Sequence, residues 1–458
     1  MHIHFIAIGG SAMHNLAIAL HKKGITVTGS DDEVFEPSNS RLSQHGLLPE
    51  KMGWDPTRIT HTIDAVILGM HAREDNPELM QAQALGLKIY SYPEYIYEAS
   101  KDKLRVVIAG SHGKTSITAM VLHVLQDLGR DVDYMVGAQL EGFDTMVKLT
   151  NDAPIIVLEG DEYLSSPIDR RPKFLWYQPH VALISGIAWD HINVFPTFEN
   201  YVEQFENFIE TLPESGSLVF CEVDQRVKNI VDSTKKKIQK IPYSTPAHKI
   251  DQGVTTLTTD FGDFPLKIFG AHNLQNLNGA RKVLNEINVT DEQFYKSIST
   301  FKGASKRLEL IASTKVTAVY KDYAHSPSKL KATINAVKAQ FPDRELIACM
   351  ELHTFSSLNK RFLEEYKGAM EGADKAIVYY NPKTLAHKQL PQISKEEVEK
   401  AFGKEGLTVM IDSERMSNYL KGLDWRSRNL LLMSSGNFDG IELNRFGKEI
   451  AESSQNKD

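Results

Sequence analysis

The sequence predicts an α/β protein in which parallel sheets are covered by helices, and three observations support this fold class. Strand and helix patterns alternate along the whole chain, as is typical of parallel sheets. Two glycine-rich turns, at 7–12 and 110–113, each follow an apolar strand and precede a helix pattern. The chain has 458 residues, 41% of them hydrophobic and 24% charged, which suits two or three domains with cores of their own.

Composition favours the reducing cytosol and argues against several classes of partner. Two cysteines, Cys221 and Cys349, are too few for a disulfide framework. A net charge of -7 argues against a nucleic-acid-binding surface. Neither a signal peptide nor an apolar stretch of membrane-spanning length is evident. We therefore expect a cytoplasmic protein that binds neither nucleic acid nor membrane and needs no obligate protein partner.

The first unit begins with IHFIAIGGSAMHNLAIALHKKGITVTGSD, which predicts a strand, a glycine turn, a helix and a second strand ending at Asp31. An acid about twenty residues beyond the glycines resembles a dinucleotide-binding fingerprint. The spacing is imperfect, because positions 7 and 12 hold alanine. Two interpretations stay open: a nicotinamide site, and a Rossmann-like unit that holds another diphosphate at Gly9, Gly10 and the helix start. Charges cluster at 101–105, where we expect this unit to end.

The second unit opens with VVIAGSHGKTSITAM (106–120), a buried strand followed by a glycine turn and a helix. Apolar residues recur on one helical face at Ile117, Met120, Val121, Val124, Leu125 and Leu128. Gly129 should end this helix.

This strand, turn and helix together predict a phosphate-binding loop. Gly110 and Gly113 let the backbone approach an anion, Lys114 adds a mobile positive charge, and Thr115 has the hydroxyl that usually holds magnesium. The loop, G-x-x-G-K-T, is shorter than the common nucleotide signature. The simpler alternative is a glycine turn with an incidental lysine.

Two further strands of this unit end in residues that bind metals. APIIVLEGDEYLSS places Glu159 at the end of an apolar run, and HVALISGIAWDHINVF does the same for Asp190 and His191. Taken singly, Glu159 would be a loop acid and His191 a surface histidine. Because ligands gather beyond the carboxyl ends of parallel strands, we expect Lys114, Glu159 and His191 to share one crevice that suits magnesium.

Two later stretches, FGAHNLQNLNGA (269–280) and FKGASKRLEL (301–310), carry polar residues at predicted turns. Asn273, Asn276 and Asn278 surround a helix start, where capping is the simple explanation. Lys306 and Arg307 are by themselves explained as linker charges.

A third unit opens with VTAVYKDYAHSPSKLKATINAV, which predicts a strand, a loop bearing Asp322 and His325, and a helix with Ser326 as N-cap and Pro327 in its first position. The buried face of that helix should contain Leu330, Ile334, Val337 and Phe341. Further strands are expected at 346–350, 376–380, 407–411 and 429–433.

The motifs GSHGKTS, EGDEY, WDH, GAHNLQN, FKGASKRLE and DYAHSP occur in the order seen in the Mur ligases, the ATP-dependent amide-forming enzymes of peptidoglycan assembly, and the chain resembles this family over essentially its whole length. The resemblance implies three domains. They are a Rossmann-like UDP-sugar-binding domain at 1–103, a central P-loop ATPase α/β domain at 104–308 and a Rossmann-like peptide-binding domain at 309–458.

The resemblance also implies a reaction. A carboxylate does not acylate an amine in water, because oxide is a poor leaving group. ATP would therefore phosphorylate the lactyl carboxylate of UDP-N-acetylmuramate, and an amino group would attack the acyl phosphate. Two Mg²⁺ ions, replaceable by Mn²⁺, would accompany the nucleotide.

The resemblance, together with the first glycine turn and the stretch MELHTFSSLNKRF that follows a strand of the third unit, suggests roles for individual residues. The catalytic residues would be Lys114, Glu159 and His191, and the metal ligands Thr115, Glu159 and His191. The ATP-binding residues would be Gly110, Ser111, His112, Gly113, Lys114, Thr115, Ser116, Asn276, Arg307 and Asp322. The UDP-sugar-binding residues would be Gly9, Gly10, Ser11, Ala12, Met13, Ser30 and Asp31. The peptide-binding residues would be His325, His353, Thr354 and Ser356, although a capped helix start explains the last three equally well.

Within the family, EGDEYLSSPIDRRPKF and SSGNFDG look more like the branch that recycles murein peptides than the branch that adds L-alanine. The expected peptide is therefore the tripeptide L-alanyl-γ-D-glutamyl-meso-diaminopimelate, and the expected process is peptidoglycan recycling, which serves cell-wall biogenesis, cell shape and division. The L-alanine-adding reaction is one alternative. A nicotinamide-dependent dehydrogenase, suggested by the first glycine turn, is another.

Several relatives use a carbamoylated lysine as a metal ligand, about fifteen residues after the histidine. Here no lysine lies between His191 and Pro213. We hypothesise that Glu203 or Glu206, on a predicted helix, supplies a carboxylate instead.

Overall fold

A computed structural model describes residues 1–140, 142–189, 194–305 and 307–455. The chain forms two compact units, which are described separately. The first comprises Met1–Ile187, Glu199–Ser244 and Gly279–Phe294, and the second comprises Ala188–Phe198, Thr245–Asn278 and Tyr295–Asp458. Among the described residues, none of the helices is both long enough and apolar enough to span a membrane.

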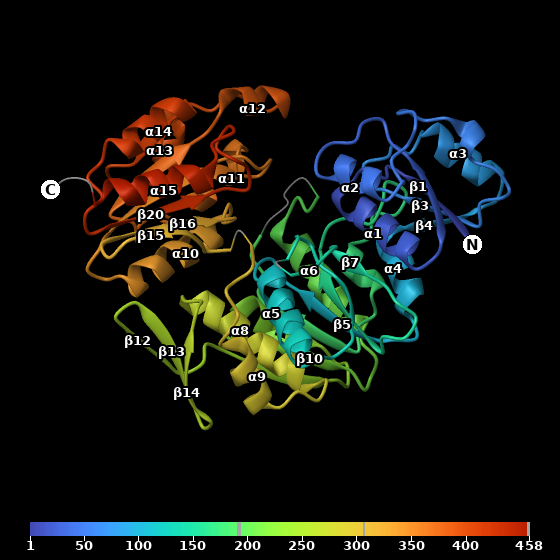
Figure 1. Ribbon diagram of the computed structural model, residues 1–458, viewed down its shortest axis with the longest axis horizontal. Coiled ribbons are helices and arrows are strands. Elements are labelled where there is room, and N and C mark those ends of the chain that lie inside the picture. The colour runs from blue at the N-terminus through green and yellow to red at the C-terminus, as the bar shows by residue number, and fades with distance from the viewer. Residues whose placement is uncertain (141, 190–193, 306, 456–458) are drawn as a thin grey trace. The chain divides into compact units, whose positions relative to one another are not determined.

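The N-terminal sheet is parallel, with the strand order β2-β1-β3-β4 (Figure 1). Its strands are β1 (His2–Ile6), β2 (Thr26–Ser30), β3 (Ala65–Leu68) and β4 (Lys88–Ser91). Its helices are α1 (Ser11–Lys22), α2 (Ser38–Gln44), η1 (Pro56–Arg58), α3 (Pro77–Ala84) and α4 (Tyr92–Ser100). Helix α4 starts with a capping box between Ser91 and Glu94, as its sequence allows.

The sheet that carries the predicted phosphate loop has the strand order β11-β10-β9-β5-β8-β6-β7 and is parallel except for the pair β6 and β7. Its strands are β5 (Leu104–Ala109), β6 (Asp133–Met135), β7 (Val147–Lys148), β8 (Ile155–Gly160), β9 (Val181–Ile184), β10 (Ser217–Cys221) and β11 (Gln239–Tyr243). The helices of this region are α5 (Lys114–Asp127), η2 (Lys173–Trp176), α6 (Phe198–Glu210), α7 (Gln225–Ser233), α8 (Ala271–Asn285) and α9 (Asp291–Ile298). Strand β5 lies in the middle of this sheet, where both faces are covered, and its apolar run is buried accordingly.

The second unit contains a small antiparallel sheet and a larger, mostly parallel one. The small sheet consists of β12 (His248–Asp251), β13 (Val254–Thr259) and β14 (Gly262–Leu266). The larger sheet has the order β15-β16-β20-β17-β18-β19, and only β15 runs antiparallel to its neighbour. Its strands are β15 (Glu309–Ser313), β16 (Thr317–Asp322), β17 (Glu345–Glu351), β18 (Lys375–Tyr379), β19 (Thr408–Met410) and β20 (Arg428–Met433). Its helices are α10 (Pro327–Gln340), α11 (Lys360–Leu363), η3 (Glu364–Tyr366), α12 (Pro382–His387), α13 (Lys395–Phe402), α14 (Ser413–Lys421) and α15 (Leu443–Ser453).

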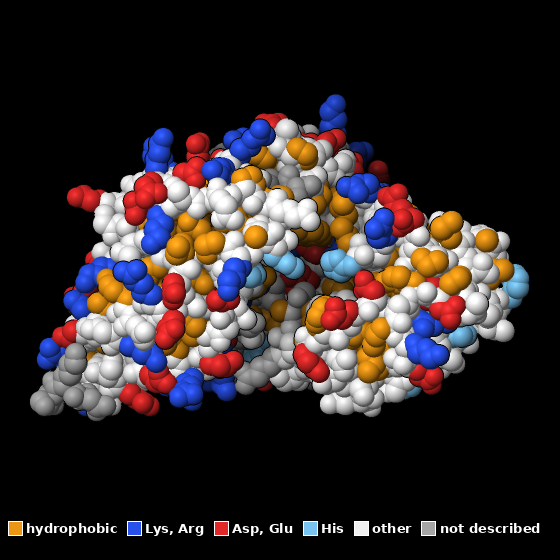
Figure 2. Space-filling model, turned by 90° about the horizontal axis from the view of Figure 1, so that it is seen from above, with side chains coloured by type: hydrophobic (Ala, Val, Ile, Leu, Met, Phe, Trp, Pro, Cys, Tyr) orange, Lys and Arg blue, Asp and Glu red, His pale blue; other side chains and the backbone are white. Residues whose placement is uncertain are grey.

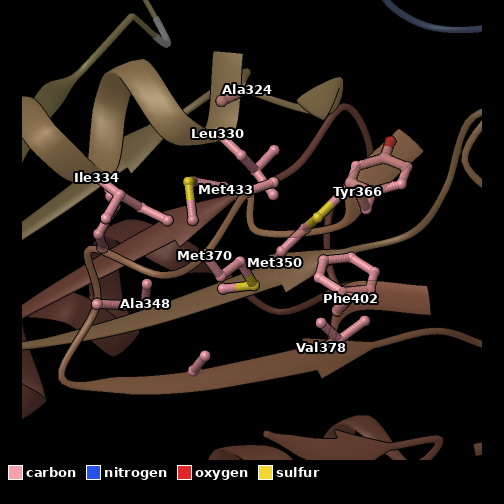
Figure 3. Close-up of a cluster of buried hydrophobic side chains, with 14 of the residues drawn as sticks. Ala324, Leu330, Ile334, Ala348, Met350, Tyr366, Met370, Val378, Phe402 and Met433 are labelled. Atoms are coloured by element: carbon pink, nitrogen blue, oxygen red, sulfur yellow. The ribbon is translucent and has the colours of Figure 1, made fainter. Parts of the chain in front are cut away.

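The larger sheet of the second unit has a hydrophobic core on each face. Figure 3 shows part of the first core, in which Leu330 and Ile334 of α10 pack with Met350 and Met433 from two neighbouring strands. The second core uses residues of α14 and α15. A sheet covered on both faces needs strands that are apolar throughout, which is the pattern of 346–350 and 429–433.

Arg105 ties the connection between α4 and β5 to the rest of the first unit. This side chain is buried, and its guanidinium donates to five backbone carbonyl groups, those of Ser100, Lys101, Lys103, Tyr177 and Gln178. The Nε–H group is shared by the carbonyls of Tyr177 and Gln178, and the two Nη1–H groups are shared by the other three. The N-terminal sheet and the sheet around β5 thus belong to one compact unit.

Most elements expected from the sequence are present, with a few shifts. The four strands expected in the third region correspond to β17, β18, β19 and β20, and α10 has Ser326 as N-cap and Pro327 first. Strand β2 ends at Ser30, one residue before the predicted end. Asn273, Asn276 and Asn278 lie within α8 rather than around its cap. The predicted α/β class is confirmed.

Basic and acidic side chains are interspersed over the face shown in Figure 2.

Candidate active site

The predicted phosphate-binding loop joins β5 to α5. Gly110 has a φ of 129° and Gly113 a φ of 80°, values that glycine adopts far more readily than other residues. A Cβ at Gly110 would lie 2.1 Å from Ser185 Oγ, because the segment of Ser185 and Gly186 is hydrogen-bonded to the loop. Helix α5 begins at Lys114, directly after Gly113, so the loop ends at a helix N-terminus, which favours an anion.

A hydroxyl and a carboxylate meet beside this loop. Glu159 is the penultimate residue of β8, and the strand register pairs it with Ile108 of β5. Thr115 Oγ1 donates to Glu159 Oε1 over 2.8 Å, and Gly137 N donates to Glu159 Oε2 over 2.8 Å. Glu159 is buried. Because hydroxyl and carboxylate oxygens are preferred ligands of Mg²⁺, Thr115 and Glu159 fit the predicted metal site.

Within the described residues, no group of three or more His, Cys, Asp or Glu side chains could hold a metal ion. Mg²⁺ is commonly held by one or two protein ligands together with water and substrate phosphates. The remaining predicted ligand, His191, and its neighbour Asp190 lie outside the described residues.

Lys114 forms an ion pair that the sequence analysis did not predict. Its Nζ donates to Glu162 Oε2 over 2.6 Å and to the Gly110 carbonyl over 2.7 Å. Burial opposes the ammonium charge, but the carboxylates of Glu162, Asp161 and Glu159 outweigh it and raise the pKa of Lys114. The site therefore holds a half-buried, paired cation at the phosphate loop. Glu162 lies in the same EGDEY motif as Glu159, three residues later, and this spacing could have indicated that a second carboxylate reaches the site.

Helix α6 contributes Tyr201 to the site. Its hydroxyl lies 2.9 Å from Ser111 Oγ and 3.0 Å from Glu162 Oε1, so it connects the phosphate loop with the carboxylate that pairs with Lys114. The same helix leaves Glu203 and Glu206 exposed. The structure thus gives no support to our hypothesis that one of these two glutamates replaces a carbamoylated lysine. Tyr201 was missed because it lies in the apolar stripe of α6, where core packing is the simple expectation.

Three of the predicted ATP-binding residues belong to the second unit. Asn276 is buried on α8. The Arg307 guanidinium lies 4.6 Å from the centre of the Tyr323 ring. Asp322 accepts from Thr333 Oγ1 over 3.0 Å, and burial raises its pKa although Arg307 opposes that change. Their approach to the phosphate loop stays a prediction.

The predicted peptide-binding residues also belong to the second unit. His325 is buried, and its Nδ1 lies 2.8 Å from the Tyr323 carbonyl oxygen. Thr354 Oγ1 accepts from Ser357 N over 3.0 Å within a turn. The next helix, α11, begins at Lys360 and is capped by Asn359, so these residues do not form the capped helix start of our alternative. Ser356 is buried. His353 is 38% exposed on its side chain and lies beside Glu351, with 3.6 Å between its Nδ1 and Glu351 Oε1.

The first glycine turn is built around Asp31. Gly9 N donates to Asp31 Oδ2 over 2.7 Å, and a Cβ at Gly9 would come within 2.9 Å of that oxygen. Burial raises the pKa of Asp31 to about 6. Ser30 Oγ donates to the fully buried Glu78. Gly10 directly precedes α1.

The helix start itself contains Ser11, Ala12 and Met13, of which Met13 is buried. Because Gly10 is the N-cap of α1, the turn ends at a helix N-terminus, a feature that favours binding of a diphosphate. The Asp31 carboxylate is engaged by the turn's own backbone, whereas a nicotinamide site uses its acid to bind a ribose hydroxyl.

Three family models match the chain. The Mur ligase family catalytic domain matches residues 2–103, the Mur ligase middle domain matches 108–284, and the Mur ligase glutamate ligase domain matches 306–432. The chain belongs to the Mur ligase family. Its members are ATP-dependent carboxylate–amine ligases, so this Mur ligase is an ATP-binding enzyme of amide-bond formation.

Individual relatives cover nearly the whole Mur ligase chain. The UDP-N-acetylmuramate–L-alanine ligase of Sulfurihydrogenibium sp. strain YO3AOP1 is 30% identical over 95% of this chain and 94% of its own. The solved murein peptide ligase of Psychrobacter arcticus 273-4 has a TM-score of 0.64 and 21% identity over 98% and 99% of the two chains. The UDP-N-acetylmuramate–alanine ligase of Thermotoga maritima has a TM-score of 0.69 and 19% identity over 99% of both.

These matches confirm the predicted three-domain α/β fold of this Mur ligase. The boundaries that we drew after residues 103 and 308 stay a prediction. Family membership leaves the alternative of a nicotinamide-dependent dehydrogenase without support.

Proposed function

We propose that this Mur ligase joins UDP-N-acetylmuramate to the tripeptide L-alanyl-γ-D-glutamyl-meso-diaminopimelate, with ATP activating the muramate carboxylate as an acyl phosphate. The observation that carries the ATP-dependent part is the convergence of Lys114, Thr115 and Glu159 at one phosphate loop. The choice of the tripeptide rests on the stretches EGDEYLSSPIDRRPKF and SSGNFDG, which resemble the recycling branch of the family.

The phosphate loop would stabilise the phosphoryl group during transfer. The N-terminus of α5 would face the phosphates, and the Lys114 ammonium would leave Glu162 to neutralise charge that develops on the transferring group. Ser111 and Tyr201 would keep the loop in position during this exchange.

Magnesium would be held by Thr115 and Glu159, with His191 as a further proposed ligand. When bound, the ion would supply positive charge to the nucleotide phosphates. Glu159 is already fixed for this task, since Gly137 N binds its second oxygen.

The remaining site residues would bind the two other substrates. The first glycine turn, with Gly9, Gly10 and the start of α1, would bind the diphosphate of the UDP-sugar. Asn276, Arg307 and Asp322 would face the nucleotide, and the residues around His325 and His353 would bind the peptide. Asn276, Arg307, Asp322 and His325 are assigned by their positions in family motifs, whereas His353 is assigned because it follows a strand of the third domain.

Formation of ADP together with the ligated product tests the proposal. The purified enzyme receives ATP, Mg²⁺ and UDP-N-acetylmuramate, with the tripeptide or L-alanine in separate reactions, and ADP and the ligated product are measured together. We expect kcat/KM for the tripeptide to exceed that for alanine by at least about tenfold, equivalent to about 1.4 kcal/mol of transition-state binding. No ADP with either amine would refute the ligase assignment.

Ligation of L-alanine is the second candidate, and the 30% identity to an enzyme of that name favours it. Both candidates use the same ATP site, so only the acceptor amine distinguishes them. Equal or better turnover with alanine would replace the tripeptide proposal with this one.

A further inference from the structure

Glu351 and His353 form a pair at the carboxyl edge of the larger sheet in the second unit. Glu351 is the last residue of β17, and His353 follows two positions later. The register pairs Met350 with Met433 of β20, and both methionines lie in the core shown in Figure 3. The pair therefore stands where two adjacent parallel strands end, the part of an α/β sheet at which ligands bind.

The Glu351 carboxylate is held so that one oxygen remains for the histidine. Its Oε2 accepts from Ser434 Oγ and, over 2.8 Å, from Phe438 N. Its Oε1 lies 3.6 Å from His353 Nδ1. Burial opposes ionisation, but these donors and His353 outweigh it and lower the pKa of Glu351. The result is a buried carboxylate anion that faces an imidazole.

The loop after β20 packs closely against the Glu351 and His353 side chains at Gly436. A Cβ at Gly436 would lie 2.8 Å from both Glu351 Oε2 and His353 Nδ1. Farther along the loop, Phe438 and Asp439 have φ values of 50° and 60°, which residues other than glycine adopt at a cost in energy. Such backbone conformations persist only where the surroundings impose them, and Phe438 N is one of the two groups that fix the carboxylate.

The pair is suited to accept a proton. With Nδ1 facing a carboxylate, the favoured neutral tautomer carries its proton there and leaves Nε2 as an acceptor. Behind Glu351 stand Cys349 and Tyr379, whose ionisation its charge opposes. Burial raises the pKa of Tyr379 to about 12 and raises that of the Cys349 thiol, so neither changes charge near neutral pH.

The ligase reaction needs such a group. An α-amino group, with an ordinary pKa of about 7.7–8.0, is largely an ammonium at neutral pH and has no lone pair for attack. Building on the proposed ligase function, we propose that His353 is the general base for the incoming amine and that Glu351 is its positioning residue.

The step balances as follows. Nε2 removes one proton from the ammonium, the nitrogen lone pair forms the C–N bond at the acyl carbon, and the C–O bond to phosphate breaks. Phosphate leaves with that electron pair and takes up the second nitrogen proton as hydrogen phosphate. The imidazolium then releases its proton to water.

Hydroxylamine separates this role from a structural one, because it is neutral near pH 7 and attacks acyl phosphates without a base. His353→Gln and Glu351→Gln are compared with wild type and with His387→Gln, an exposed histidine of α12. Each protein receives ATP, Mg²⁺ and UDP-N-acetylmuramate with either hydroxylamine or the better of the two amines, tripeptide or alanine. Hydroxamate, amide and ADP are measured.

We expect His353→Gln to lower kcat for the amine by about 10²-fold or more, while hydroxamate formation stays within about threefold of wild type. The acidic limb of the wild-type pH profile should be absent from this variant. Glu351→Gln should lower kcat for the amine while hydroxamate formation stays within about threefold of wild type, because the imidazole loses the carboxylate that orients it. His387→Gln should match wild type in every reaction.

Two results would overturn the inference. Parallel loss of hydroxamate and amide in His353→Gln would show that the side chain does not act as the base. A wild-type enzyme that forms neither product from UDP-N-acetylmuramate would refute the proposed function itself, and the inference with it.

Discussion

Lys114 Nζ lies 2.6 Å from Glu162 Oε2, so the cation of the phosphate loop is paired with a buried carboxylate. A phosphate entering the loop must displace this carboxylate or share the ammonium with it. Removing one electrostatic contact to a transferring group typically costs about 10²–10³ in rate. We therefore expect Lys114→Met to lose about that factor in ADP formation. Lys148→Met, which removes an exposed lysine paired with Asp131, should leave the rate unchanged.

Glu162→Gln should tighten nucleotide binding. The variant keeps the shape of the side chain but removes a charge that competes with phosphate for Lys114. Because a charge-assisted hydrogen bond contributes about 1.5–3 kcal/mol, the Kd for ADP measured by calorimetry without magnesium should fall about tenfold. Glu203→Gln, on the exposed side of α6, is the matched control and should not change it. Weaker ADP binding by Glu162→Gln would contradict the displacement argument.

Tyr201→Phe removes a buried hydroxyl that contacts both Ser111 and Glu162. We expect the free energy of unfolding, measured in urea, to fall by about 1–2 kcal/mol, since a buried partner loses a hydrogen bond. The KM for ATP should rise as the loop loses this support. Tyr419→Phe, at a site 39% exposed, should change neither quantity.

Gly110→Ala places a methyl group 2.1 Å from Ser185 Oγ at a φ of 129°. The loop cannot keep its path, and we expect ATP binding to fall below detection in calorimetry. Gly129→Ala is the informative comparison, because its φ is 65° and nothing lies within 4 Å of the added atom. That variant should lose about 1–2 kcal/mol of stability and keep its kcat. Equal ATP affinity in both variants would show that the contact with Ser185 is unimportant.

The raised pKa of Asp31, about 6 against an ordinary 3.8, predicts a pH effect on stability. Between these values the folded protein binds a proton more tightly than the unfolded chain, so this group's contribution falls as pH rises through about 4 to 6. Asp31→Asn should therefore stabilise the protein relative to wild type, by about 1 kcal/mol more near pH 7.5 than near pH 4.5. Urea titrations at both pH values test this. Asp152→Asn, an exposed control, should show no such difference.

Local sequence patterns were sufficient for the elements that position the site. The apolar run at 106–109 and the helical face beginning at Ile117 predict β5 and α5, and Gly129 ends the helix as expected. Glu159 could be placed because the end of a buried strand is visible in the sequence. Its hydrogen bond to Thr115 then follows from the pairing of β5 with β8.

Contacts between distant segments could not be predicted in the same way. Tyr201 reaches Ser111 across 90 positions of sequence, and its place in an apolar stripe indicates only burial. Glu203 and Glu206 were plausible by spacing, but the rotation of α6 turns Tyr201 inward and leaves both acids outside. The Glu351 and His353 pair likewise depends on Phe438, which the sequence brings close only through the order of strands β17 and β20.

The hydrogen bonds of Arg105 also limit how the chain can bend between α4 and β5. A hinge needs backbone torsions that rotate freely, yet any rotation between α4 and β5 would break several hydrogen bonds of one buried guanidinium at once. We therefore expect the segment after Ser100 to be rigid. A ligand bound at the first glycine turn would not move the phosphate loop by bending the chain at this segment.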